Sequence, residues 1–401
     1  MALLNQIIST IKPSATLALG QKVLEMKAAG EDVIGLAGGE PNFPTPKFIC
    51  DAAIQAIQAG QTKYTAVDGT PELKQAIIDK FSKDHGLACK PHNIIVGTGA
   101  KQLLYNAFMV TLNPGDEVIV PAPYWVSYPP MVQCAQGHSV FVPTSEAAGF
   151  KLRPRALSKV ITKKTKWLCL NSPSNPTGAV YSVDELKALG EVLAQYPHVH
   201  VISDDIYEKL IFDGQSFATI AQVCPHLQDR VLTINGVSKA YAMTGWRIGY
   251  AAGPVGLIKA MKTLQSQSTS SANSIAQAAS AAALNGDQSF LTSWVQKYQS
   301  RRDLMMRNMA DIPGLKVCKP SGAFYLWVNC QGLLGKKTPA GTALETDMDV
   351  ADYLLDSVKV AVMPGSAFGM GPYLRFSIAV SQENLDKAAE RFRGAVARLS
   401  S

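Results

Sequence analysis

Apolar, strand-like runs alternate with helix-like segments between Asn93 and Gly253, and this alternation limits the folds that the chain can adopt. The runs are IIVG, EVIVP, KWLCLN, HVISD and RVLTING, each followed by a turn or a helix pattern. Successive strands joined by helices form a parallel sheet whose ligand-binding loops gather at one edge. We therefore expect an α/β fold with a mostly parallel, doubly wound sheet and a crevice along that edge.

The length of the chain predicts more than one domain, because 401 residues exceed what a single core normally supports. Residues 46–299 are expected to form a large domain around the sheet. Residues 300–401 carry the short strands KVCKP and AFYLWVN and a closing amphipathic helix from Glu383 to Leu399. Together with residues 1–45 they are expected to form a smaller α+β domain, which both ends of the chain build.

Local patterns predict several helices. Thr70 and Pro71 are typical of a helix N-cap and the first helical position after it. A charged helix is expected from Gln21 to Ala29. A polar helix rich in Ser and Gln is expected over residues 264–283, and a long helix over residues 290–309.

Composition excludes some classes of partner. The chain has 38 Lys and Arg against 31 Asp and Glu, a net charge of +7, and basic residues do not alternate with aromatic ones as on a nucleic-acid surface.

The seven cysteines lie far apart without a CxxC pair, which predicts free thiols in a reducing compartment and no metal site. No apolar run approaches about 18 residues, so we expect no membrane span and a cytoplasmic protein.

The segment VSKAYAMTGWRIGY follows the strand-like run RVLTING and contains Lys239 and Arg247. The strand would deliver Lys239 into an apolar turn bounded by glycines, where lost hydration lowers the pKa of an amine. A neutral amine can form a Schiff base with a carbonyl, while Arg247 keeps its charge and suits a phosphate. An amine beside a phosphate site is what pyridoxal 5'-phosphate (PLP) requires, although most lysines and arginines are solvated surface residues.

Other strand ends carry residues that suit a ligand site at the same edge. They are Gly99, Ala100, Lys101, Trp125, Asn175, Asp204 and Tyr207. The first three open a helix, whose N-terminal N–H groups attract anions. Each residue alone also fits a scaffold role, but their convergence favours a binding crevice. Arg375 lies among apolar residues in the strand YLRFSIA, and a buried guanidinium needs an anionic partner.

These residues lie in motifs that occur together and in order: GGEPNFPTP, KYTAVDGTPEL, GTGAKQ, PAPYW, NSPSNPTG, DDIYEKL, SKAYAMTGWRIGY, MPGSAFG and LRFS. With them the sequence resembles class I aminotransferases of PLP fold type I over nearly its whole length, and most closely the bacterial aspartate aminotransferase subgroup. The resemblance implies a homodimer with shared active sites. It also implies reversible, ping-pong amino transfer from L-aspartate to 2-oxoglutarate, which gives oxaloacetate and L-glutamate.

The resemblance implies how the cofactor would be held. Lys239 would form the Schiff base with PLP and later shuttle a proton, and Asp204 would pair with the pyridinium nitrogen. Tyr207 and Asn175 would hydrogen-bond the phenolic oxygen, and Trp125 would stack on the ring.

The phosphate of the cofactor would meet backbone N–H groups, an arginine and hydroxyl groups. These are implied at Gly99, Ala100, Lys101, Arg247, Ser238 and Tyr64 of the partner subunit. Some family members have a further hydroxyl three positions before the lysine, where this chain has Gly236.

For the substrate, Arg375 resembles the fork that binds the α-carboxylate through two charge-assisted hydrogen bonds. The side chains of Asn175 and Trp125 and the N–H of Gly39 would complete that site. In this subgroup the distal carboxylate is held without a second arginine, by residues that correspond to Ser14, Thr16 and Lys101. Dicarboxylic amino acids and their 2-oxo acids are therefore the expected substrates.

Two alternatives remain beside this expectation. Members of the subgroup can also transaminate prephenate, and Lys12 and Thr16 lie where its second carboxylate would reach. The same fold also occurs as a non-catalytic effector-binding domain of transcription regulators. That role would leave Lys239 and Arg375 as unexplained buried cations, and no basic helix-turn-helix region precedes the GGEPNF segment.

Overall fold

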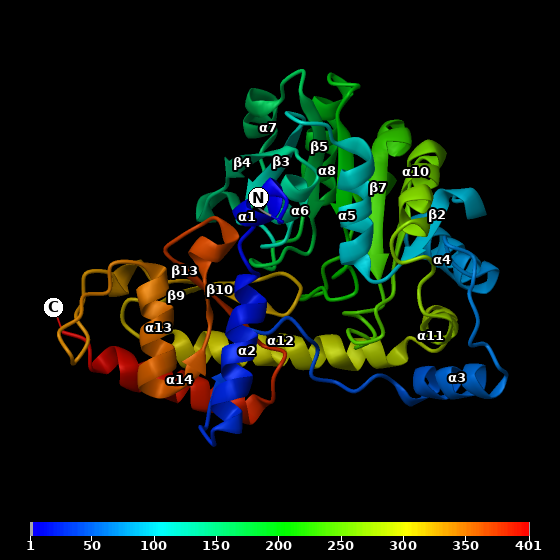
Figure 1. The fold of residues 1–401 in the computed structure, drawn as a ribbon. Coiled ribbons are helices and arrows are strands. Elements are labelled where there is room, and N and C mark those ends of the chain that lie inside the picture. The colour runs from blue at the N-terminus through cyan, green and yellow to red at the C-terminus, as the bar shows by residue number, and fades with distance from the viewer. Residues whose placement is uncertain (1–2, 401) are drawn as a thin grey trace.

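A seven-stranded sheet forms the centre of the computed structural model, which describes residues 3–400 (Figure 1). In spatial order the strands are β2 (Ile94–Gly97), β8 (Gly249–Ala252), β7 (Val231–Gly236), β6 (His200–Asp204), β5 (Thr165–Asn171), β3 (Glu117–Ala122) and β4 (His138–Pro143). β8 runs antiparallel to β7 and β2, and the pairs from β7 across to β4 are parallel. The predicted α/β class with a mostly parallel sheet is confirmed.

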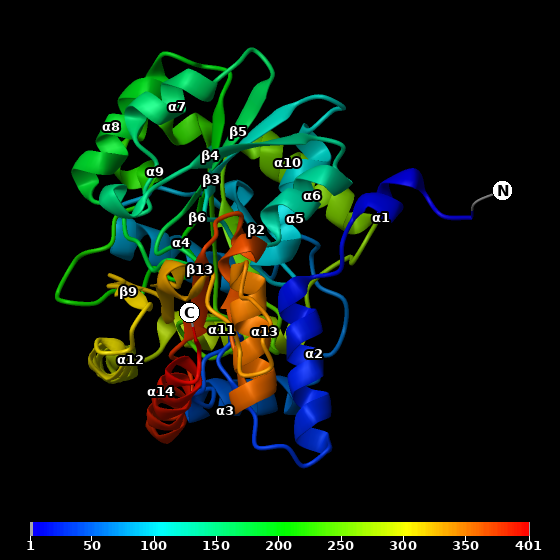
Figure 2. The same cartoon turned by 90° about the vertical axis from the view of Figure 1, so that its left-hand side faces the viewer.

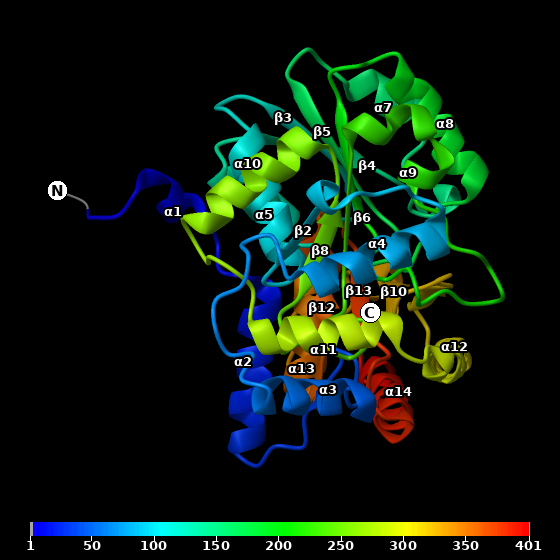
Figure 3. The ribbon, with the colours of Figure 1, turned by 90° about the vertical axis from the view of Figure 1, so that its right-hand side faces the viewer.

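Both faces of this sheet are buried, which explains why its strands are apolar on successive residues. Along β3, Val118 and Val120 pack into one core cluster, whereas Ile119 packs into the cluster on the opposite face. The first cluster is closed by α5 (Ala100–Thr111), α6 (Tyr128–Cys134) and α10 (Val255–Ser266). The second is closed by α3 (Lys47–Gln58), α4 (Pro71–His85), α7 (Pro154–Val160), α8 (Val183–Ala194), α9 (Ile220–Val223) and α11 (Ser274–Asn285) (Figure 3).

A second, antiparallel sheet lies below the first in the view of Figure 1. In spatial order its strands are β12 (Met363–Pro364), β13 (Tyr373–Ser377), β10 (Tyr325–Asn329) and β9 (Lys316–Cys318). The helices of this part are α12 (Ser289–Met309), α13 (Asp347–Val358) and α14 (Gln382–Ala397) (Figure 2). They share a core cluster with the buried side chains of β10 and β13, so one apolar interior joins these elements.

The N-terminal segment joins this smaller part of the molecule. β1 (Ile34–Gly35) pairs in parallel with β11 (Val360–Ala361), and Ile34 and Leu36 belong to the same core cluster as α14. Both chain ends therefore contribute to this α+β region, as the predicted fold class requires. The domain boundaries that the sequence suggests, at residues 45/46 and 299/300, stay predictions.

Two predicted helices are wrong in their extent. The expected helix at Gln21–Ala29 is α2 (Ala15–Ala28), which follows the short α1 (Gln6–Thr10). The expected helix over residues 264–283 is two helices, because α10 ends at Ser266 and α11 begins at Ser274. The side chain of Asn273 accepts a hydrogen bond from the Ala276 N–H, so this polar stretch caps a new helix instead of continuing the first.

Other local predictions are confirmed. The Thr70 side chain accepts a hydrogen bond from the Leu73 N–H, and Pro71 is the first residue of α4.

Short 3-10 helices complete the secondary structure: η1 (Pro91–Asn93), η2 (Glu146–Ala148), η3 (Pro225–Arg230), η4 (Gln331–Leu333) and η5 (Gly365–Phe368). Within residues 3–400, none of the helices has the length and apolar character that crossing a membrane requires.

Candidate active site

A cavity of about 340 Å³ lies at the carboxyl ends of the central strands, between the two sheets. The side chains and backbone of residues from both parts of the molecule line it. Those that the sequence singles out are Ser14, Thr16, Gly39, Ala100, Lys101, Trp125, Asn175, Asp204, Tyr207, Ser238, Lys239, Arg247 and Arg375. The parallel sheet thus brings its strand ends to one crevice, and β13 of the second sheet adds Arg375.

Lys239 lies just after β7, and its ammonium nitrogen donates a 2.7 Å hydrogen bond to the Gly39 carbonyl. Burial lowers the pKa of this lysine to about 8. The charge of Glu40 opposes the shift, whereas the cations Arg247 and Arg375 add to it. A substantial fraction of the amine is therefore neutral in mildly alkaline solution, as a nucleophilic lysine requires.

Asp204 ends β6 and is only 4% exposed. The hydroxyl of Tyr128 donates a 2.6 Å hydrogen bond to its Oδ2, whereas Oδ1 has no partner among residues 3–400. Burial raises the pKa of Asp204 to about 6, although the Tyr128 hydrogen bond favours the anion. A carboxylate oxygen held in this way is suited to a protonated nitrogen placed in the cavity.

The sequence reasoning did not identify Tyr128. It follows Trp125 by three residues in PAPYWVSY, the turn between β3 and α6. The two rings meet edge to face with their centroids 5.4 Å apart. The only sequence signal is that spacing within an aromatic-rich turn.

One end of the cavity is suited to an anion. α5 begins there, and the N–H groups of Ala100 and Lys101 have no backbone acceptor within the described chain. The guanidinium of Arg247 lies against Gly99, where a Cβ atom would collide with it. The glycine therefore leaves the space that the arginine occupies. Two unpaired N–H groups and a guanidinium at a helix N-terminus form an anion site.

Two of the residues expected at this end lie outside the cavity lining. The Gly99 N–H already donates a 2.8 Å hydrogen bond to the Gly97 carbonyl, so Ala100 and Lys101 supply the free N–H groups. Tyr64 is 94% exposed on the surface of this chain. At Gly236 a Cβ would come within 3.0 Å of the Ile248 carbonyl oxygen, so the position has little room for a hydroxyl-bearing side chain.

Arg375 lines the cavity from β13 and is 2% exposed. Its Nη1 donates to Oδ1 of Asn175 at 2.9 Å and its Nη2 to the Ala37 carbonyl at 2.6 Å. Nε has no partner, and no carboxylate within residues 3–400 forms an ion pair with this guanidinium. A buried cation without a counterion is suited to bind a carboxylate that enters the cavity.

A second cation faces the same space. The ammonium nitrogen of Lys101 lies 5.0 Å from the centre of the Trp125 ring. Burial lowers the pKa of Lys101, and the nearby Arg247 lowers it further. Ser14 is the N-cap residue of α2, but its side chain makes no capping hydrogen bond. Ser14, Thr16 and Lys101 all line the cavity, and their hydroxyl and ammonium groups are suited to a second carboxylate.

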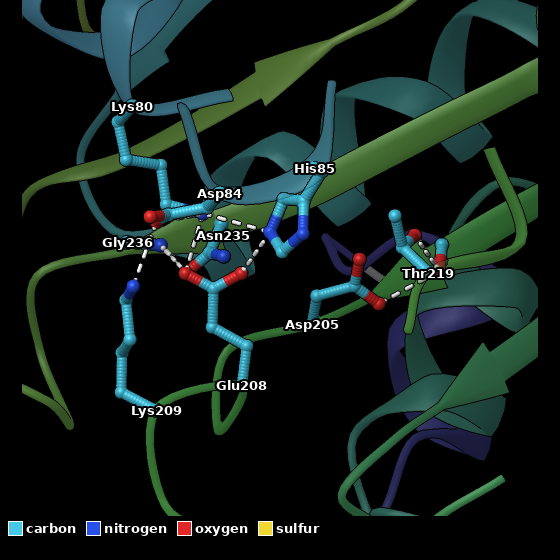
Figure 4. A network of polar contacts seen from close by, with 10 residues as sticks. Lys80, Asp84, His85, Asp205, Glu208, Lys209, Thr219, Asn235 and Gly236 are labelled. Carbon is cyan, nitrogen blue, oxygen red and sulfur yellow. Dashed lines mark hydrogen bonds and ion pairs between the residues drawn. The ribbon is translucent and has the colours of Figure 1, made fainter. Parts of the chain in front are cut away.

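A network of charged side chains, most of them buried, contacts Glu208 in the turn after β6 (Figure 4). Asp204 and Tyr207 line the cavity, whereas Glu208, next to Tyr207, forms an ion pair with Lys80 and has its Oε2 2.6 Å from Nε2 of His85. Asp84, His85 and Glu208 offer ligand atoms within 4.8 Å of one another, as in a metal site. The ammonium group of Lys80 contacts this cluster and balances its negative charge, so the cluster is an ion-pair network.

Comparison with known proteins gives the family. The model of the family "Aminotransferase class I and II" matches residues 31–392. The chain therefore belongs to the class I and II aminotransferases.

Similar proteins cover the whole chain. It is 54% identical over 393 residues to a probable aspartate/prephenate aminotransferase of Rhizobium leguminosarum bv. phaseoli, covering 98% of each chain. It is 53% identical to the aspartate/prephenate aminotransferase of Cereibacter sphaeroides, covering 100% of both. The solved aspartate aminotransferase of Rhizobium meliloti superposes with a TM-score of 0.97 at 50% identity, covering 100% of both chains.

A Thermus thermophilus aspartate aminotransferase solved with maleate has a TM-score of 0.92 at 42% identity. That match covers 98% of this chain and 100% of the Thermus chain. The resemblance to bacterial aspartate aminotransferases that the motifs indicate is confirmed by these relatives.

Proposed function

We propose that this aminotransferase binds PLP and transfers the amino group of L-aspartate to 2-oxoglutarate, reversibly and in two half-reactions. The observation that carries the proposal is the meeting of Lys239, Asp204, Arg247 and Arg375 around one cavity. The relatives named aspartate aminotransferase support the choice of substrate.

The donor set of the cavity fits the proposed cofactor. The unpartnered Oδ1 of Asp204 suits the pyridinium nitrogen, and the free N–H groups of Ala100 and Lys101 suit the phosphate, together with Arg247 and Ser238. The indole of Trp125 is suited to stack on the face of the cofactor ring. When bound, PLP supplies an electron sink that stabilises negative charge at the substrate Cα.

The residues of the chain have distinct tasks in this proposal. Lys239 would hold the cofactor through its neutral amine and would serve as the base that moves the Cα proton of the substrate. Asp204 keeps the ring nitrogen protonated because its carboxylate stabilises a positive charge nearby. Tyr207 and Asn175 orient the phenolic oxygen of the cofactor by hydrogen bonds.

Substrate selection follows from the two cationic places in the cavity. Arg375 binds the α-carboxylate, with Asn175, Trp125 and the N–H of Gly39 beside it. The polar group of Ser14, Thr16 and Lys101 binds the side-chain carboxylate. Maleate, the molecule in the Thermus relative, is also a dicarboxylate, which supports this assignment.

The proposed assembly is a homodimer in which Tyr64 of the partner subunit reaches the phosphate. Tyr64 is 94% exposed in the single chain, so its side chain is accessible to a second subunit, as this assembly requires. The cytoplasmic location and the lack of a metal stay predictions from the sequence.

Prephenate is a second candidate acceptor. Relatives at 54% and 53% identity are named aspartate/prephenate aminotransferases, which supports it. Thr16 lines the cavity, whereas Lys12 is not among its lining residues. The regulatory-domain alternative is disfavoured because the relatives carry enzyme names over their whole length.

The test is a panel of amino donors and oxo-acid acceptors, prephenate included, on purified protein with added PLP. We expect visible absorbance of bound cofactor and the highest kcat/KM for aspartate with 2-oxoglutarate. Absence of cofactor absorbance would refute the proposal, and a higher kcat/KM with prephenate than with 2-oxoglutarate would favour the second candidate.

A further inference from the structure

Tyr325 lines the same cavity but is absent from the residues that the motifs single out. It lies at the start of β10 and is 1% exposed. Its hydroxyl oxygen is 2.9 Å from the hydroxyl oxygen of Tyr207, which follows β6. This contact joins the second sheet to the first across the cavity.

The ring and the hydroxyl of Tyr325 have separate neighbours. The guanidinium of Arg375 lies over the ring, with its central carbon 4.4 Å from the ring centre. The hydroxyl lies close to Gly39, where a Cβ would come within 2.7 Å of the oxygen. Tyr325 therefore contacts the proposed α-carboxylate arginine with one part and the proposed cofactor tyrosine with another.

The direction of the hydrogen bond between Tyr207 and Tyr325 follows from counting protons. Burial raises the pKa of both tyrosines, so each keeps its one hydroxyl proton near neutral pH. A phenolate oxygen of a bound cofactor can only accept, so with the cofactor in place Tyr207 would direct its proton there. The proton between the two tyrosine oxygens must then come from Tyr325.

We propose that Tyr325 is a positioning residue that donates its hydroxyl proton to Tyr207 and supports Arg375 with its ring. The inference rests on the proposed function, because the acceptor of the Tyr207 proton is the bound cofactor. A donor to the oxygen of Tyr207 polarises that hydroxyl and strengthens the bond that Tyr207 itself donates.

With the cofactor bound, the strengthened bond would act on the proton that the Lys239 nitrogen would share with the phenolic oxygen. Loss of that proton leaves the negative charge of the phenolate uncompensated, so a strong donor at Tyr207 favours its loss. Removal of the Tyr325 hydroxyl should therefore make this proton harder to remove.

The experiment is a pH titration of the visible absorbance of the purified holoenzyme. In Tyr325→Phe, which keeps the ring, we expect the midpoint to rise by about half a pH unit, since one neighbouring bond strengthens the next by about 10–30%. The KM for aspartate should change less than about twofold. In Tyr325→Leu the same rise should be joined by an increase of about fivefold or more in KM, because the ring under Arg375 is lost.

Tyr353→Phe is the matched control, since the Tyr353 hydroxyl donates a 2.9 Å bond to the Ala395 carbonyl away from the cavity. Its titration midpoint should equal that of the unaltered protein. In a Tyr207→Phe background, adding Tyr325→Phe should cause no further rise, because the residue that transmits the effect is gone.

An unchanged midpoint in Tyr325→Phe holoenzyme would overturn the inference while leaving the proposed function intact. If that variant does not fold, an unchanged midpoint in Tyr325→Leu has the same consequence. An unaltered protein that shows no cofactor absorbance would instead contradict the proposed function itself.

Discussion

The hydroxyl of Tyr128 donates a 2.6 Å hydrogen bond to Oδ2 of Asp204 and leaves Oδ1 of that carboxylate without a partner among residues 3–400. Burial raises the pKa of Tyr128 well above its ordinary value, so the proton stays on the tyrosine. The bond fixes the rotation of the carboxylate and favours its anionic form, while one oxygen remains available to the cavity.

Tyr128→Phe should lower kcat/KM for aspartate about tenfold. The expectation follows because a hydrogen bond to a charged group contributes about 1.5–3 kcal/mol and Asp204 would become less anionic. Steady-state kinetics measures the loss. Tyr181→Phe removes another buried tyrosine hydroxyl, whose oxygen accepts a 2.8 Å hydrogen bond from the Leu152 N–H. This control variant should leave kcat/KM nearly unchanged. Equal losses in both variants would contradict the role of the Tyr128 contact.

Lys239→Ala should abolish both transamination and the visible absorbance of the cofactor linked to the protein. No other lysine amine is expected to replace it, because Lys239 is the buried lysine beside Asp204. Absorbance spectra with PLP and an aspartate assay check this, with the exposed Lys159→Ala as control. If the variant kept both the lysine-linked absorbance and the activity, Lys239 would not be the lysine that binds the cofactor.

Arg375→Lys should raise the KM for every amino donor. An ammonium group cannot reproduce the planar fork, and loss of one charge-assisted hydrogen bond of about 1.5–3 kcal/mol corresponds to roughly 10- to 150-fold. Arg302→Lys is the control, because Arg302 is equally buried but pairs with Asp213 at 2.7 Å. That variant should lower stability and leave KM unaffected. A KM in Arg375→Lys equal to that of the unaltered protein would count against carboxylate binding.

Lys101→Ser should weaken dicarboxylic donors selectively. The backbone N–H at the anion end is kept, so cofactor binding should persist, while the distal carboxylate loses a charged partner. We expect kcat/KM for aspartate to fall by about tenfold or more and that for alanine to stay within about twofold. The same loss for both donors would show that Lys101 does not distinguish them.

Glu208→Gln should destabilise the protein by about 3 kcal/mol, since the buried Lys80 loses its nearest anion and keeps only Asp84 at 3.7 Å. Urea unfolding measures this. Glu383→Gln breaks an exposed pair with Lys387 and should cost less than about 1 kcal/mol. A Glu208→Gln variant as stable as the control variant would show that the buried network contributes little.

The same network makes the free energy of unfolding depend on pH. Burial alone would raise the pKa of Glu208, but Lys80 and His85 hold it at about 2, below the ordinary value of 4.5. Since the folded-state pKa is depressed, the stabilisation is complete above pH 4.5 and is lost as the pH falls toward 2. The unfolding free energy of the unaltered protein should therefore drop more steeply with acid than that of Glu208→Gln.

Much of the site could be predicted from local sequence. Lys239 and Arg247 lie in one segment after a buried strand, and Arg375 is conspicuous as a cation in an apolar strand. The single helix that the sequence predicts over residues 264–283 is wrong, because a polar composition rich in Ser and Gln does not show that Asn273 caps a new helix. Gly99 was expected to offer its N–H, which the turn itself uses for the Gly97 carbonyl.

The sequence by itself determined the fold class and the kinds of group at the strand ends, because hydrophobic periodicity and turn residues act over a few neighbouring positions. Its ordered motifs carried the resemblance to the family. Only the tertiary structure decided that the Tyr207 and Tyr325 hydroxyls, 118 residues apart, meet at 2.9 Å. Only the tertiary structure likewise shows that Oδ1 of Asp204 has no partner among residues 3–400. Such contacts depend on how two sheets pack together, and packing joins distant residues through shape and burial that no local pattern records.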